Sequence, residues 1–155
     1  MSLALNDAQL DLRPMVETDL SDILEIECAA YTFPWNRNIF KGCLRDDYCC
    51  RVVELDGEIA GYAIMSMGKD EAHLLNLCVD PGRQRLGLGD NLLKFMLDFA
   101  RTHNAVSTFL EVRPSNMAAR QFYEKRGFVE VGLRANYYPA RFGREDAIIM
   151  ARETV

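Results

Sequence analysis

The chain has 155 residues and a formal net charge of −5 at pH 7. This length predicts one domain, residues 1–155, which can bury a core without disulfides or a metal ion. The acidic balance argues against the basic face of a nucleic-acid-binding protein, and no apolar run approaches the roughly 20 residues that span a bilayer. Neither nucleic acid nor a membrane is therefore an expected partner.

The five cysteines show neither a CxxC pair nor a His/Cys grouping with the spacing of metal ligands, so we expect no metal site. Thiols of this kind persist in a reducing compartment, which predicts a cytoplasmic location. The sequence leaves the oligomeric state open.

Apolar and polar residues alternate over residues 9–13, which predicts a half-buried strand. Thr18 is predicted to cap a first helix, the segment TFPW at residues 32–35 ends it, and Asn36 is predicted to cap a second. The spacing places four residues on the inward face of the second helix: Ile39, Phe40, Cys43 and Leu44.

Two strands are predicted next, at residues 50–55 and 59–67, joined by Asp56-Gly57. Asp-Gly is a strong hairpin signal because both central positions of the tight turn favour positive φ. A third strand, residues 72–79, ends at the turn formed by Asp80, Pro81 and Gly82.

The second half of the chain is predicted to alternate helices and strands, with a last strand pair around a polar loop that holds Tyr137, Tyr138 and Pro139. The elements are a helix at residues 87–103, a strand at 106–112, a helix at 116–126, and strands at 128–133 and 146–150. Gly127 fits the C-terminal cap of the second of these helices. The order predicts an α/β fold with a mostly antiparallel sheet and helices on both faces.

The clearest chemical signal is the segment VDPGRQRLGLGDN, which starts at Val79. Gly87 and Gly89 begin a helix, where each glycine costs about 1 kcal/mol relative to alanine. Without Cβ atoms the nearby amides can approach an anion, and the helix N-terminus adds unpaired donors. The segment lacks the Gly-Lys-Ser/Thr ending of a Walker loop and the last glycine of GxGxxG. The residues alone leave open a glycine-rich turn without function.

The hexapeptide QRLGLG, Gln84 to Gly89, matches the Q/R-x-x-G-x-G/A signature of the GCN5-related N-acetyltransferases (GNAT), and the later segments EVRPSN and YEKRGF resemble the same family. The order of elements is similar to that family over nearly the whole chain. The resemblance implies the GNAT fold, in which the two central strands, here those that hold Val79 and Glu111, splay apart. It also implies acetyl-CoA as co-substrate.

The resemblance further implies which residues hold the coenzyme. Backbone groups of Leu77, Cys78 and Val79 would bind the pantetheine arm. The amides of Arg85, Leu86, Gly87, Leu88, Gly89 and Asp90 would bind the pyrophosphate. Asn116 fits a helix cap by itself, and the family adds a compatible coenzyme contact.

Two catalytic roles follow from the same resemblance. Glu111 would act as general base through a water molecule, and Tyr123 as general acid for the coenzyme A thiolate. From the residues alone, Glu111 also fits a solvated charge at a strand end, and Tyr123 also fits a packed core residue. Because no histidine near Cys78 in the sequence would activate it, we expect direct amine attack in a ternary complex without a covalent acetyl-enzyme.

The segments FPW, NYYP and GREDAIIM are similar to those of the bacterial ribosomal-protein-alanine N-acetyltransferases, a subgroup of the family. This implies a ribosomal protein N-terminus as acceptor, with Trp35, Tyr138 and Glu145 as candidate contacts. Trp35 and Phe33 fit either the core or the acceptor wall. Two alternatives remain: a lysine side chain or small amine as acceptor, or a module that binds acetyl-CoA without catalysis.

Overall fold

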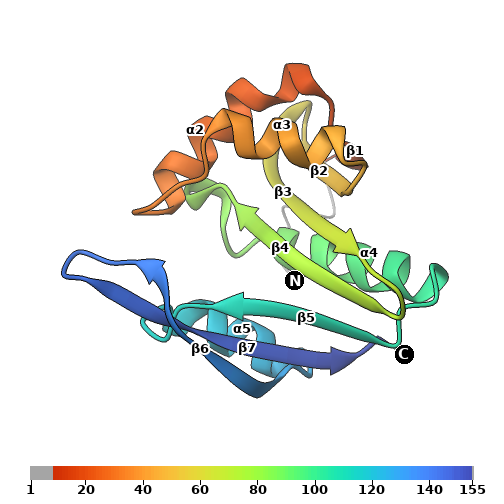
Figure 1. Cartoon of the computed structure of the whole chain (residues 1–155). Helices are drawn as coiled ribbons and strands as arrows, with labels where there is room; N and C mark the ends of the chain where they lie inside the picture. The colour runs from red at the N-terminus through yellow and green to blue at the C-terminus, as the bar shows by residue number, and fades with distance from the viewer. Residues whose placement is uncertain (1–8, 155) are drawn as a thin grey trace.

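In the computed structural model, residues 9–154 form a seven-stranded sheet in the order β1-β2-β3-β4-β5-β7-β6, with helices on both faces (Figure 1). The ends of the predicted domain, residues 1–8 and 155, lie outside the described range. Within that range, no helix has the length and apolar character needed to cross a membrane.

The elements follow the predicted order of strands and helices. They are β1 (Leu10–Pro14), the 3-10 turn η1 (Glu17–Asp19), α2 (Leu20–Ala30), α3 (Arg37–Arg45), β2 (Cys49–Leu55), β3 (Glu58–Met67), β4 (Glu71–Val79), η2 (Pro81–Arg83), α4 (Leu88–Thr102), β5 (Ser107–Val112), α5 (Met117–Lys125), β6 (Val129–Pro139) and β7 (Arg144–Glu153). The α/β fold with a mostly antiparallel sheet is confirmed.

Several local predictions are confirmed because they depend only on neighbouring residues. The Asn36 side chain accepts a hydrogen bond from the Ile39 amide at 3.0 Å and so caps α3. Asp56 and Gly57 take φ values of 52° and 84° in the β2–β3 hairpin. Gly127, with φ of 93°, follows α5 in the left-handed conformation.

The cap predicted at Thr18 is wrong. Thr18 lies inside η1. The Asp19 carboxylate accepts a hydrogen bond from the Val16 amide at 2.8 Å. Asp19 also accepts from Arg13 at 2.8 and 2.9 Å. The Asp19 bond closes the 3-10 turn onto the Val16 amide, and the N-cap position of α2 falls on Asp19, whose side chain does not cap the helix. The inward position predicted for Ile39 is also wrong, because this residue is 43% exposed at the first turn of α3.

The predicted polar loop around Tyr137 and Tyr138 is in fact strand. β6 continues to Pro139 because a register shift between Arg134 and Tyr138 breaks its alternation without ending its pairing with β7. Asn136 takes a φ of 53° in this irregular stretch. A strand with such a bulge has no period-two pattern for the sequence to reveal.

The central strand pair opens like a V, as Figure 1 shows for β4 and β5. These strands pair in parallel only from Glu71 opposite Ser107 to Leu74 opposite Leu110. Beyond Leu74, β4 keeps its antiparallel pairing with β3, while β5 keeps its pairing with β7. The splayed central strands implied by the resemblance are therefore confirmed.

A register shift in the β3–β4 ladder leaves Leu75 as an extra residue in β4. Before it, Leu74 packs into the core cluster that includes α4. After it, Asn76 and Cys78 face the opposite side, towards α2. The bulge lies where β4 leaves β5. Because of the extra residue, the side chains of β4 that face the opening are not those that regular alternation would place there.

Candidate active site

A cavity of about 460 Å³, here called the α4 cavity, lies between the end of β4, the start of α4 and α5. It brings together nine of the ten predicted coenzyme residues: Leu77, Cys78, Val79, Arg85, Gly87, Leu88, Gly89, Asp90 and Asn116. The tenth, Leu86, packs against the hydrophobic core instead.

The start of α4 leaves several backbone donors open. Gly87 occupies the N-cap position with φ of 80° and has no side chain to cap the helix, so the first amides of α4 have no intrahelical partner. Gly89 has a different reason to be glycine, because a Cβ there would lie 3.2 Å from the Phe122 ring of α5. These open amides on a 15-residue helix fit a phosphate group.

The free edge of β4 offers further backbone groups. The Asp80 amide donates to the Ala60 carbonyl at 2.7 Å, so alternation directs the N–H and C=O of Cys78 towards β3 and those of Leu77 and Val79 towards the opening. The expected backbone contact of a pantetheine arm can thus come from Leu77 and Val79, but not from Cys78, whose backbone groups point into the sheet.

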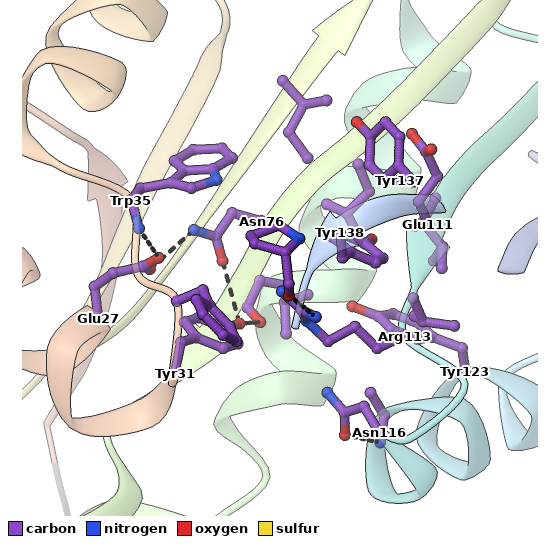
Figure 2. Close-up of a pocket in the computed structure, with 18 residues that line it drawn as sticks. Glu27, Tyr31, Trp35, Asn76, Glu111, Arg113, Asn116, Tyr123, Tyr137 and Tyr138 are labelled. Carbon is purple, nitrogen blue, oxygen red and sulfur yellow. Dashed lines mark hydrogen bonds between the residues drawn. The ribbon is translucent and has the colours of Figure 1, made fainter. Parts of the chain in front are cut away.

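A second cavity, of about 450 Å³, lies on the other side of the opening and is called the Trp35 cavity (Figure 2). Trp35 and Tyr31 border it on one side, and Glu111 and Tyr138 on the other. The Trp35 ring also meets the buried Phe40 ring edge-on at 5.2 Å. Trp35 is therefore both a wall of this cavity and a contact of the core.

The two cavities meet at the opening between β4 and β5. Five residues line both: Tyr31, Leu77, Asn116, Ala119 and Tyr123. Asn116 caps α5 by accepting the Ala119 amide at 3.2 Å while it lines both cavities, so its two predicted roles are compatible. Tyr123 is 8% exposed, and its hydroxyl makes no hydrogen bond with any residue from 9 to 154, which leaves a free donor at the junction.

Glu111 approaches the junction from the Trp35 cavity. Leu110 and Val112 point into the core, so alternation places Glu111 on the opposite face of β5, as predicted. Its Oε2 is buried and accepts no hydrogen bond from the described residues, although the Arg134 Nε lies 3.2 Å away. A carboxylate oxygen with a free lone pair next to a cavity is suited to accept a proton.

The matching family model is the acetyltransferase (GNAT) family, which covers residues 13–128. This chain belongs to the GNAT acetyltransferase family. It is 45% identical to the ribosomal protein bS18-alanine N-acetyltransferase of Salmonella typhimurium over 134 residues, which is 86% of this chain and 90% of the relative.

Two solved structures are similar to this GNAT chain. The Escherichia coli ribosomal-protein-S18-alanine N-acetyltransferase has a TM-score of 0.87 and 40% identity, with 94% of each chain covered. The yncA protein of Salmonella typhimurium, solved with its cofactor acetyl-CoA, has a TM-score of 0.75, 22% identity and 94% coverage of each chain, a likeness of fold. This chain is an N-acetyltransferase, and acetyl-CoA is its acetyl donor.

The electrostatics of the GNAT site favour protonated hydroxyl and thiol groups near the junction. Burial raises the pKa of Tyr123 above its usual value, so its hydroxyl stays a proton donor through the neutral and mildly alkaline range. Burial also raises the pKa of the Cys78 thiol to about 11. A thiol protonated at neutral pH is a poor nucleophile, which argues against an acetyl-cysteine intermediate.

Arg113 is a feature of the site that the sequence did not predict. Its guanidinium carbon lies 5.1 Å from the centre of the Phe33 ring and 4.4 Å from that of Tyr138. Its Nη1 donates to the Pro139 carbonyl at 2.7 Å and to Glu145 at 3.2 Å. Arg113 therefore joins the loop between α2 and α3 to the β6–β7 hairpin at the rim of the Trp35 cavity.

Glu145 lies at this rim and does not line the Trp35 cavity. It accepts hydrogen bonds from the Ser115 amide and hydroxyl, each at 3.0 Å, as well as from Arg113. These bonds hold the pKa of Glu145 below its usual range. The Glu145 oxygens are thus already bonded to the turn before α5, so Glu145 stabilises the rim of the Trp35 cavity.

Glu27 forms a buried network that the sequence also did not reveal. Its carboxylate accepts hydrogen bonds from Tyr62 at 2.5 Å, from Asn76 at 3.0 Å and from the Trp35 amide at 2.9 Å. Figure 2 draws the bonds from Asn76 and from the Trp35 amide. The side chain is 2% exposed. Since one carboxylate fixes α2, the Trp35 loop, β3 and the bulged part of β4, it sets the shape of one wall of the cavity.

The sequence held a signal for one of these residues. Arg113 lies two positions after Glu111, so strand alternation places it on the same face as the predicted base. Glu27 gave no such signal, because its partners lie 8, 35 and 49 residues away along the chain.

Proposed function

We propose that this enzyme acetylates the α-amino group of an N-terminal alanine, and that its acceptor is a ribosomal protein. The observation that carries the proposal is the Trp35 cavity, which reaches Tyr123 from the side opposite the α4 cavity. A chain end can enter such a pocket while the rest of the acceptor stays outside. The substrate named for the relatives supports a ribosomal acceptor. With that acceptor, the proposed location is the cytoplasm.

In the proposed reaction, acetyl-CoA supplies an activated acetyl thioester. Glu111 accepts a proton from the acceptor α-ammonium group, and the neutral amine that this forms bonds to the acetyl carbon. The Val79 N–H, which faces the opening, donates to the carbonyl oxygen as negative charge develops on it. Tyr123 donates a proton to the sulfur as the carbon–sulfur bond breaks. The second proton that the nitrogen loses passes through solvent to restore the Tyr123 hydroxyl, and Glu111 releases its own proton to solvent.

The acceptor chemistry favours an N-terminal amine over a lysine side chain. An α-amino group has a pKa near 8 and a lysine side chain one near 10.4, so about a hundredfold more α-amine is neutral at pH 7. Among the described residues of the Trp35 cavity, Glu111 and Glu27 are the only carboxylates, and Glu27 is already bound by three donors. A single available base is sufficient for an α-amine, which loses its proton more readily than a lysine side chain does.

Acceptor peptides test this proposal directly. Peptides with a ribosomal protein N-terminal sequence and a free alanine are expected to be acetylated. The same peptides with a blocked N-terminus and an internal lysine are expected to react at least about a hundredfold more slowly. Mass spectrometry gives the modified position, and a comparison of ribosomal-protein N-termini from cells with and without the gene identifies the acceptor. Faster acetylation of the blocked lysine peptides would contradict the proposal.

A further inference from the structure

The C-terminal end of α5 presents an arginine to the α4 cavity. The Arg126 guanidinium lies over the Phe122 ring, 3.7 Å from its centre, and Nη1 donates to the Phe122 carbonyl at 2.8 Å. The Arg126 carbonyl accepts from Arg152 of β7 at 2.7 Å, which fixes the backbone at this point. Nη2 makes no hydrogen bond with any residue in the range 9–154. The side chain is thus held in place with a donor left free.

Asp90 is an unexpected neighbour for an anion site. It lies in the first turn of α4, beside the amides that fit a phosphate, and it lines the same cavity. Asp90 is paired with the Nε of Arg126. The hydrogen bond from Arg126 holds the pKa of Asp90 below its usual range, so Asp90 is charged at neutral pH. An isolated carboxylate here would repel the pyrophosphate, and Arg126 compensates that charge.

The charge balance of the cavity favours a second role for Arg126. Among the described residues that line the α4 cavity, Arg85 and Arg126 are the cations and Asp90 is the anion. The net charge of these side chains is therefore small. Coenzyme A brings a pyrophosphate and a ribose 3′-phosphate. If Arg126 served only Asp90, one arginine would face all of these phosphates.

We propose that Arg126 binds a phosphate group of coenzyme A, with Asp90 holding its guanidinium in place across the mouth of the α4 cavity. The planar guanidinium stacks on Phe122, keeps Nε for Asp90 and offers Nη2 to the phosphate. The phosphate is either the 3′-phosphate or the pyrophosphate. This inference rests on the coenzyme of the family and not on the identity of the acceptor.

Calorimetric titrations with coenzyme A and with 3′-dephospho-coenzyme A show whether Arg126 binds the 3′-phosphate or the pyrophosphate. The chain, its R126Q variant and its R120Q variant are compared. Arg120 is a matched control because it lies on the same helix, pairs with Glu130 and does not line the α4 cavity. R126Q is expected to weaken binding of coenzyme A about tenfold, the effect of a lost charge-assisted hydrogen bond. The D90N/R126Q double variant has no unpaired carboxylate beside the amides and is expected to bind as weakly as R126Q, whereas recovery of binding in the double variant would show that Arg126 only neutralises Asp90.

If the 3′-phosphate is the ligand, R126Q binds 3′-dephospho-coenzyme A as tightly as the unmodified chain does. If the pyrophosphate is the ligand, R126Q weakens both compounds equally. R126K keeps the charge without the planar fork and is expected to fall between R126Q and the unmodified chain. R126Q and R126K that bind both compounds as tightly as R120Q would overturn the proposal. Because the readout is binding without acceptor, its failure is distinct from failure of the acceptor assignment.

Discussion

Replacement of Tyr123 by phenylalanine is expected to lower kcat by at least about 10²-fold, the usual contribution of a general acid. The ring stays in place, where it meets the Phe122 and Phe128 rings edge-on at 5.2 and 5.5 Å, so folding and coenzyme affinity should change little. The hydroxyl is lost at the point where the two cavities join. Steady-state kinetics and calorimetry with coenzyme A measure the two effects separately.

The pH dependence gives this prediction a second readout. Because burial raises the pKa of Tyr123, its hydroxyl stays protonated below pH 10, and no loss of kcat from its ionisation is expected up to that pH. Tyr48→Phe is a suitable control, because Tyr48 packs at the α3 side and lines neither cavity. A Tyr123→Phe enzyme with the full rate would remove Tyr123 from the mechanism.

Replacement of Glu111 by glutamine is expected to lower kcat at pH 7 by about 10²-fold, because the amide cannot accept the amine proton. Coenzyme affinity should stay within twofold, since Glu111 lines only the Trp35 cavity. The rate of the variant should rise towards that of the unmodified enzyme as the pH passes the α-amine pKa of about 8, because the neutral amine then forms without a base. A pH–rate profile measures this recovery.

Glu71→Gln provides the control for this variant. Glu71 begins β4, is exposed and lines neither cavity, so its loss should leave the profile unchanged. Turnover of Glu111→Gln at pH 7 equal to that of the Glu71→Gln control would show that another group takes the proton.

The sequence predicted those parts of the fold that depend on local chemistry. Asp56-Gly57 defines a hairpin, Asn36 and Asn116 cap helices, and Gly87 begins α4 because each of these residues acts on its immediate neighbours. The glycine-rich turn and the helix that follows it are therefore predictable from the sequence alone. The resemblance to the GNAT family extended that prediction to the splayed strands.

Features that depend on distant partners could not be predicted in this way. The bulge at Leu75 and the irregular end of β6 disturb the alternation on which strand prediction depends. The N-cap position of α2 falls on Asp19 instead of Thr18, and the Asp19 carboxylate is held by Arg13 of β1 and by the Val16 amide. Glu27 likewise takes its role from three partners that only the fold brings together.

The opening between β4 and β5 is the centre of the proposed mechanism, and the crystal structure of a bisubstrate complex tests it most directly. The ligand is coenzyme A joined through its sulfur and an acetyl group to a peptide with N-terminal alanine. We expect the pantetheine to pass between Val79 and Asn116, the sulfur to lie within hydrogen-bond reach of Tyr123, and the peptide to enter the Trp35 cavity beside Glu111. A ligand bound outside this opening, or a sulfur remote from Tyr123, would contradict the mechanism.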